Sequence, residues 1–410
     1  MRLKEAVLAS LVAPALCAPE PAAAQADSIL PVALPAPWGE HAIGMRVLVV
    51  EDSSRTAADS DGASGPRPVL VRVWYPARSG SGRPKAYMDS ALAEAWRSTL
   101  PVPAGFERRV APHAEVDAPW ADPTPEGGWP VLLFSHGRSF PVENYQIALE
   151  QLASQGWVVA ALSHVGEEAL TALPDGRVFP FSGPGWEAPG ERGQVLMGVV
   201  DEFALDASRA LDALEREAAE SGGPFEGRLA LEDGVGYFGH SLGGAAAVWT
   251  MQRDRRVRAA ASWEGQVYRD QDRPLTVRGP LLYLIGSANR RDLSWSHFRS
   301  GGAEAPVYEA VIRGAWHASF GELLHVYRAY GPREWQEGHR REITAERANQ
   351  ISADLLDAFF GAHLLGRASD LLRPDTPEEG EDTRRWNYPE VDLSASAAPS
   401  GAPADRSPER

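Results

Sequence analysis

The sequence predicts an α/β fold with a mostly parallel central sheet and helices on both faces. From Trp129 onward, short apolar runs alternate with stretches whose apolar residues recur at helical spacing. Strands that read as continuously apolar are typical of parallel sheets covered on both sides. One strand–turn–helix segment also carries a glycine-flanked serine, Gly239-His240-Ser241-Leu242-Gly243-Gly244.

The elements follow from hydrophobic periodicity. A helix near residues 203–214 is expected because Phe203, Ala207, Leu211 and Leu214 share one face. The polar stretch Glu51–Pro68 is expected to be a long hairpin loop, since it holds several Gly, Ser and Asp residues. The other expected helices are Asn144–Ser154, Leu242–Met251 and about Ala345–Leu365, and the expected strands are Met45–Val50, Val69–Tyr75, Pro130–Phe134, Trp157–Leu162, Gly234–Phe238, Arg258–Trp263, Leu281–Ile285 and Val307–Ile312.

The chain divides into three parts. Arg2 and Lys4 precede an apolar run and an Ala24-Gln25-Ala26 cleavage pattern, so residues 1–26 are predicted to be a signal peptide. Residues 27–368 form the predicted globular domain, and the Pro-, Glu-, Ser- and Ala-rich residues 369–410 are predicted to be a disordered tail. The protein is then exported, to the periplasm or the medium. A buried N-terminal helix and a lipid anchor on Cys17 are the alternatives.

Composition excludes several classes of function. The formal net charge is −16, which argues against a nucleic-acid-binding surface. Cys17 is the only cysteine and lies in the signal, so the mature chain has no disulfide and no thiolate ligand. No His and carboxylate residues have convincing metal spacing, and we expect neither a metal nor a cofactor.

The serine segment matches the nucleophile elbow of the α/β-hydrolase fold. There the nucleophile occupies a strained turn, so small residues must flank it. Gly239 and Gly243 meet that need, and Ser241 is the predicted nucleophile. The base should follow the last strand, which selects His317 in Gly314-Ala315-Trp316-His317 over its rivals His297 and His325.

The acid that orients this histidine has two candidates. Glu264 ends one strand and Asp292 follows the next, and spacing alone does not choose between them. The oxyanion donors should be the N–H of Leu242 and an N–H of the early Ser-His-Gly loop, Arg138 or alternatively Gly137. His136 and His240 are interpreted as scaffolding.

These segments together resemble the platelet-activating factor acetylhydrolase family, over about Pro37 to Leu365. The segments that carry the likeness are Asp52-Ser53-Ser54-Arg55, Trp74-Tyr75-Pro76-Ala77, Phe134-Ser135-His136-Gly137, Gly239–Gly244 and Gly314–Phe320. In this family the acid follows the strand after the elbow helix, usually as Asp-Gly or Asp-Ala. Glu264-Gly265 occupies that place, so the resemblance favours Glu264, with glutamate in place of aspartate.

The resemblance implies calcium-independent hydrolysis of short or oxidised acyl chains on phospholipid-like esters. The expected partner is thus a small-molecule or lipid ester; the oligomeric state and contact with a lipid surface stay open. Residues 165–196, with Phe179, Phe181 and Trp186, are either a lid over the site or a surface insertion. The alternatives are a lipase, cutinase or polyester hydrolase with the same triad, and a non-catalytic binding protein on this scaffold.

Overall fold

The computed structural model describes residues 29–80, 82–98, 100, 102–184, 192–266, 277–289, 303–332, 343–373 and 388–396. Predictions for the signal peptide, Cys17, Trp186, Asp292 and His297 lie outside these residues.

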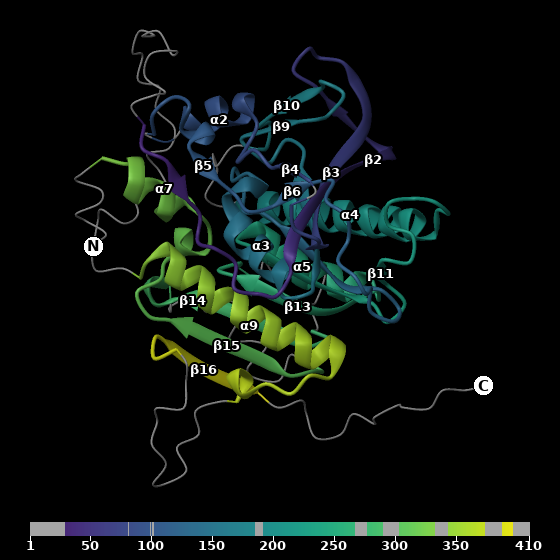
Figure 1. Cartoon of the computed structure of the whole chain (residues 1–410), viewed down its shortest axis with the longest axis vertical. Coiled ribbons are helices and arrows are strands. Elements are labelled where there is room, and N and C mark those ends of the chain that lie inside the picture. Colours follow the sequence, from purple (N-terminus) through teal and green to yellow (C-terminus); the bar gives the residue numbers. More distant parts are fainter. Residues whose placement is uncertain are drawn as a thin grey trace.

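A large twisted sheet runs through the described part of the molecule (Figure 1). Its spatial order is β16-β15-β14-β13-β12-β7-β8-β3-β2-β6-β4, with β11 paired to β7. Strands from β15 to β8 are parallel, whereas β16, β3 and β2 add antiparallel pairs at the two sides. Its strands are β2 (Ala42–Ala58), β3 (Ser64–Ala77), β4 (Arg83–Pro84), β6 (Glu115–Val116), β7 (Trp129–Ser135), β8 (Val158–His164), β11 (Leu229–Ala230), β12 (Val235–His240), β13 (Val257–Trp263), β14 (Leu281–Gly286), β15 (Val307–Ile312) and β16 (Val391–Ser396).

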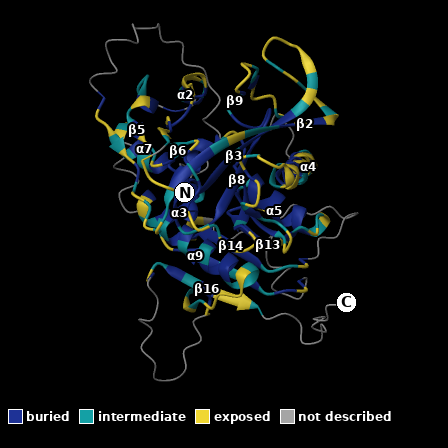
Figure 2. Cartoon of the chain, turned by 45° about the vertical axis from the view of Figure 1, so that its right-hand side comes forward, coloured by how far each residue is buried: buried dark blue, intermediate teal, exposed yellow. Residues whose placement is uncertain are grey.

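Helices cover both faces of this sheet, as the apolar strands predict. Helices α4 and α5 pack on one face with Leu133, Ala160 and Tyr237, and α3 and α9 pack on the other with Leu132 and Phe238. The central strands are buried, while α4 turns an exposed side to solvent (Figure 2). The helices are α2 (Ser90–Arg97), α3 (Gln146–Ser154), α4 (Arg192–Ala219), α5 (Leu242–Arg253), α7 (Leu323–Tyr330) and α9 (Ala345–Leu365).

Smaller elements complete the fold around the sheet. The pairs β1 (Val32–Ala33) with β5 (Val110–Ala111) and β9 (Leu170–Ala172) with β10 (Val178–Pro180) stand apart from it. Short 3₁₀ turns are η2 (Phe106–Arg108), η3 (Val142–Tyr145), η4 (Ser287–Asn289), η5 (His317–Phe320) and η6 (Asp370–Leu372). Among the described helices, none is long and apolar enough to cross a membrane.

The expected hairpin loop over Glu51–Pro68 is wrong. Strands β2 and β3 continue through this stretch and leave only residues 59–63 between them, with a register shift between Asp52 and Thr56. The stretch is polar because many of its side chains face solvent. Asp52 is the polar side chain that is buried in this stretch, and it accepts hydrogen bonds from Ser54 and from Arg55 at 2.7 Å.

The predicted disordered tail over 369–410 is also wrong for its described residues. Residues Val391–Ser396 form β16, which pairs antiparallel with β15 and gives the sheet its outer strand. Val391 and Leu393 alternate with polar residues and lie buried against the α9 face. This six-residue alternation was hidden by the Pro- and Glu-rich composition around it.

Replacing Leu393 tests whether β16 contributes to stability. Leu393→Ala removes buried apolar volume, and we expect it to lower the free energy of unfolding by about 2 kcal/mol. The neighbouring Ser394 is exposed, so Ser394→Ala should change it by less than about 0.5 kcal/mol. Urea unfolding measures both. Equal stability of the two variants would contradict a packed β16.

Candidate active site

The predicted nucleophile lies in a strained turn between β12 and α5. Ser241 has φ 53° and ψ −117°, and its N–H donates to the carbonyl of Trp263 at 2.8 Å. A non-glycine residue in such a region costs about 1–3 kcal/mol and persists only where its surroundings enforce it. Here a Cβ on Gly243 would stand 2.2 Å from the Ser135 carbonyl oxygen, and one on Gly239 would stand 2.4 Å from Gly243. Glycine at these two positions therefore lets the elbow press against β7.

The structure brings the predicted base and acid together beside this elbow. His317 begins η5 just after β15, and its Nδ1 lies 3.4 Å from Oε2 of Glu264. The other Glu264 oxygen accepts a hydrogen bond from the N–H of Gly286. The Glu264 side chain is 2% exposed, whereas that of His317 is 26% exposed. The carboxylate is thus buried and held, with the imidazole between it and solvent.

The close packing of the acid loop explains why a glycine, Gly265, follows Glu264. A Cβ on Gly265 would stand 2.6 Å from the Ser241 carbonyl oxygen, so the acid loop passes directly over the elbow. Glu264 itself has φ 54°. The 3.4 Å distance to His317 is long for a hydrogen bond, and catalytic hydrogen bonds often tighten only when substrate binds.

Of the other residues considered for the base and the acid, the structure describes only His325, and it places this histidine away from Ser241. His325 lies on α7, where its ring contacts Glu346 at 2.8 Å and the carbonyl of Ala33 at 3.1 Å. Asp292 and His297 lie outside the described residues. Mutagenesis of Glu264 and Asp292 can therefore decide which of the two is the triad acid.

The oxyanion loop follows β7, and its contacts distinguish the two proposed donors. The Gly137 N–H already donates to the hydroxyl of Tyr145 at 3.1 Å, which favours Arg138 as the oxyanion donor. Leu242 is the first residue of α5, where backbone N–H groups have no partner within the helix. Ser139, with φ 67°, turns the loop and donates its N–H to the Glu167 carbonyl at 2.7 Å.

The Arg138 side chain ties this loop to the segment that contains β9 and β10. Its Nε donates to Glu167 at 2.8 Å, a terminal nitrogen donates to the carbonyl of Pro184, and its guanidinium lies 5.1 Å from the Phe181 ring centre. Phe179 is buried in a small hydrophobic cluster with Leu70, Val165 and Leu173, while Phe181 is 39% exposed. The described part of 165–196 is therefore attached to the oxyanion loop.

Tyr145 and His240 connect the oxyanion loop with the base loop. The Tyr145 hydroxyl lies 2.8 Å from Nδ1 of His240, and Nε2 of His240 lies 2.8 Å from the His317 carbonyl oxygen. A carbonyl only accepts, so Nε2 carries the proton and Nδ1 accepts from Tyr145. Burial, with His317 nearby, lowers the pKa of His240 well below its ordinary value, so this ring stays neutral. Tyr145 could not be singled out as a functional residue from the sequence, because it occupies an ordinary apolar position of the expected helix Asn144–Ser154.

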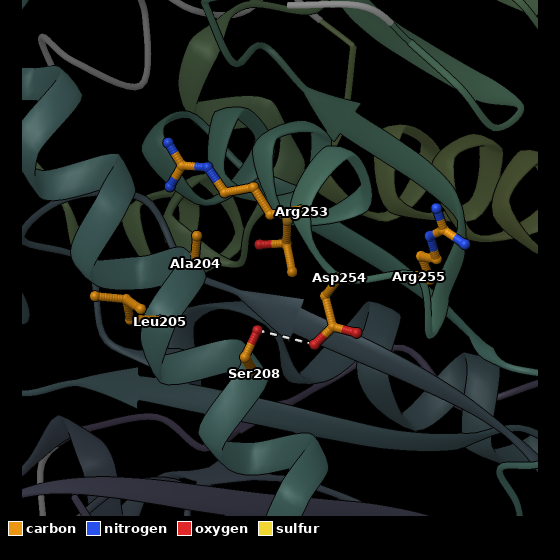
Figure 3. Close-up of a pocket in the computed structure, with 7 residues that line it drawn as sticks. Ala204, Leu205, Ser208, Arg253, Asp254 and Arg255 are labelled. Carbon is orange, nitrogen blue, oxygen red and sulfur yellow. Dashed lines mark hydrogen bonds between the residues drawn. The ribbon is translucent and has the colours of Figure 1, made fainter. Parts of the chain in front are cut away.

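A surface pocket lies away from these groups (Figure 3). It is lined by α4 and by the last turn of α5, about 18 Å along that helix from Ser241. Several of its polar groups are paired: Ser208 donates to Asp254 at 2.9 Å, and Arg253 pairs with Asp201 of α4 at 2.7 Å. The pocket adds nothing to the chemistry of the site.

Two comparisons bear on this arrangement. Residues 32–174 match the family model for platelet-activating factor acetylhydrolase, isoform II. The predicted resemblance is confirmed there. This region contains the hairpin β2–β3 and the oxyanion loop, and it ends before Ser241.

A solved ferulic acid esterase from Streptomyces cinnamoneus has a similar fold. It is 24% identical, superposes with a TM-score of 0.69, and the match covers 88% of this chain and 98% of that one. The chain has the α/β-hydrolase fold, as predicted. Together with the groups at the sheet edge, the family match supports a carboxylic ester hydrolase.

Replacing Glu264 tests the acid. Glu264→Gln keeps the side-chain volume but removes the charge next to His317 Nδ1, and kcat should fall by about two to four orders of magnitude. Asp292→Asn should leave kcat within about threefold. Steady-state hydrolysis of p-nitrophenyl acetate measures both variants. A larger loss in Asp292→Asn would assign the role to that residue.

Replacing Tyr145 tests the link between the two loops. Tyr145→Phe leaves the Gly137 N–H and the His240 Nδ1 without their partner, and kcat should fall about tenfold. Tyr388→Phe is the control, because that hydroxyl donates to Asp354 of α9. Its kcat should stay within about twofold of the unmodified enzyme. Equal activities of the two variants would show that Tyr145 has no part in catalysis.

Proposed function

We propose that this chain is an exported serine esterase that cleaves short acyl esters of phospholipid-like substrates through Ser241, His317 and Glu264. The observation that carries the proposal is the buried Glu264 carboxylate facing His317 Nδ1, beside a serine with left-handed backbone. The signal-like residues 1–26 support export.

Each group has one task in the proposed reaction. His317 takes the proton of Ser241 as its Oγ attacks the ester carbonyl, since a serine hydroxyl needs a base to become a nucleophile. The N–H groups of Leu242 and Arg138 donate to the oxyanion. His317 then protonates the leaving alcohol, and Glu264 orients the imidazole and stabilises its positive charge. A water molecule activated by His317 releases the acid and frees Ser241.

The two comparisons suggest different acyl groups for the ester substrate. The family match supports short acyl chains on phospholipid-like esters. The similar esterase, by its name, acts on ferulic acid esters, which makes aromatic acyl esters a second candidate. A lipase, cutinase or polyester hydrolase would use the same three residues. A non-catalytic protein on this scaffold would use none.

An ester panel on the exported protein separates these candidates. We expect kcat/KM for a 2-acetyl phospholipid to exceed that for a long-chain triacylglycerol emulsion by about tenfold or more, with no release of products from a polyester film. Methyl ferulate is included in the same panel. Preference for the emulsion, the film or the ferulate would replace the proposed substrate and leave the triad in place.

Labelling by a fluorophosphonate tests whether the chain is an enzyme at all. Such probes react with activated serines, so the unmodified protein should be labelled and Ser241→Ala should not. Thermal unfolding confirms that both proteins are folded. Absence of labelling in the folded, unmodified protein would favour a non-catalytic function.

A further inference from the structure

A second Ser-His-Asp arrangement lies beneath the proposed site. The Ser135 hydroxyl lies 2.7 Å from Nε2 of His164, and Nδ1 of His164 lies 2.9 Å from Oδ2 of Asp206. The hydroxyl of Tyr237 lies 2.6 Å from the same Ser135 oxygen. The four side chains form one continuous line of hydrogen bonds across β12, β7, β8 and α4.

This arrangement is not a second active centre. Ser135, His164 and Asp206 are each 0% exposed, so no ester reaches the Ser135 hydroxyl. Strand β7 lies between β8 and β12 in the interior of the sheet. The Ser135 hydroxyl also has two partners already.

The direction of each hydrogen bond is fixed from the Asp206 end. Both Asp206 oxygens accept from arginines, at 2.6 Å from Arg55 and at 3.0 and 3.1 Å from Arg67. Burial opposes the charge, but the hydrogen bond from His164 and the charge of Arg67 hold the pKa of Asp206 below its ordinary value. An ionised carboxylate only accepts, so His164 donates from Nδ1 and accepts at Nε2 from Ser135. The Ser135 hydroxyl has one hydrogen and donates it to His164, so the Tyr237 hydroxyl must donate to Ser135.

The ring of His164 is held in place by packing as well. It stacks on Phe203 of α4, with ring centres 3.6 Å apart and planes inclined by 13°. Its backbone N–H donates to Nε2 of His136 at 3.2 Å. The ring therefore has one position and one tautomer, which in turn fixes the Ser135 side chain.

Ser135 occupies the position where the oxyanion loop begins. Residues His136, Gly137 and Arg138 follow it directly, and its carbonyl oxygen is the atom that a Cβ on Gly243 would approach to 2.2 Å. A shift of Ser135 would thus displace the loop relative to the elbow. His164 is the last residue of β8, which leads into the 165–184 segment, and Tyr237 lies in the middle of β12, which leads into the elbow.

We propose that Ser135, His164, Asp206 and Tyr237 are positioning residues that fix the oxyanion loop against the nucleophile elbow. The arginines Arg55 and Arg67 of the β2–β3 hairpin complete the chain by holding the Asp206 carboxylate. The inference rests on the proposed function, because it concerns the donors of that reaction.

Matched serine variants test the role. Ser135→Ala breaks the chain, while Ser352→Ala removes an equally buried hydroxyl that donates to Ala348 within α9. With p-nitrophenyl acetate, we expect kcat of Ser135→Ala to fall about tenfold or more with KM within about twofold. A trifluoromethyl ketone forms an adduct whose oxyanion accepts from the N–H groups of Leu242 and Arg138. It should bind to Ser135→Ala about tenfold more weakly than to the unmodified enzyme. Ser352→Ala should match the unmodified enzyme in both measurements.

Tyr237→Phe is a smaller change, which tests the same role in a variant that is expected to fold normally. Tyr237→Phe keeps the ring and removes only the terminal donor, so kcat should fall about threefold with little change in thermal midpoint. If kcat of Ser135→Ala and Tyr237→Phe equals that of Ser352→Ala while the unmodified enzyme is active, the inference is wrong. If the unmodified enzyme hydrolyses no ester and takes no fluorophosphonate label at Ser241, the proposed function fails and the inference fails with it.

Discussion

The left-handed backbone of Ser241 is the constraint on which the site depends. It is kept only because the helix after it and the strand beside it approach to backbone contact, at Gly239, Gly243 and Gly265. Because β7, β12 and β13 pair in parallel, their carboxyl ends meet at the same edge of the sheet. The oxyanion loop and the acid loop follow from these strand ends, so their positions are set by how closely the elbow packs.

Polar side chains then maintain this packing from two sides. Tyr145 and His240 join the oxyanion loop to the base loop above the elbow. Below it, the chain from Tyr237 to Asp206 ends on two arginines of the β2–β3 hairpin. Buried polar groups of this kind are costly unless every member is paired, and a fully paired network holds one arrangement. Both networks connect segments that are far apart in the sequence.

The parts that the sequence could predict are those with a local signal. Apolar runs and helical spacing placed the sheet, and α9 coincides with the predicted residues 345–365. Ser241, His317 and Glu264 could be proposed because each follows a predicted strand. The outer part of the β2–β3 hairpin, within Glu51–Pro68, and strand β16 were missed because their exposed residues make them read as loops. The roles of Tyr145 and Ser135 could not be predicted, since their hydrogen-bond partners are determined only by the folded chain.

The buried histidines have an electrostatic consequence for the reaction. Burial lowers the pKa of His136, His164 and His240, so near neutral pH these rings are dipoles without net charge. The ring of His240 is centred 4.5 Å from that of His317. When His317 takes up the serine proton, its new positive charge therefore meets a neutral imidazole, and the His240 ring adds no charge repulsion to the transition state.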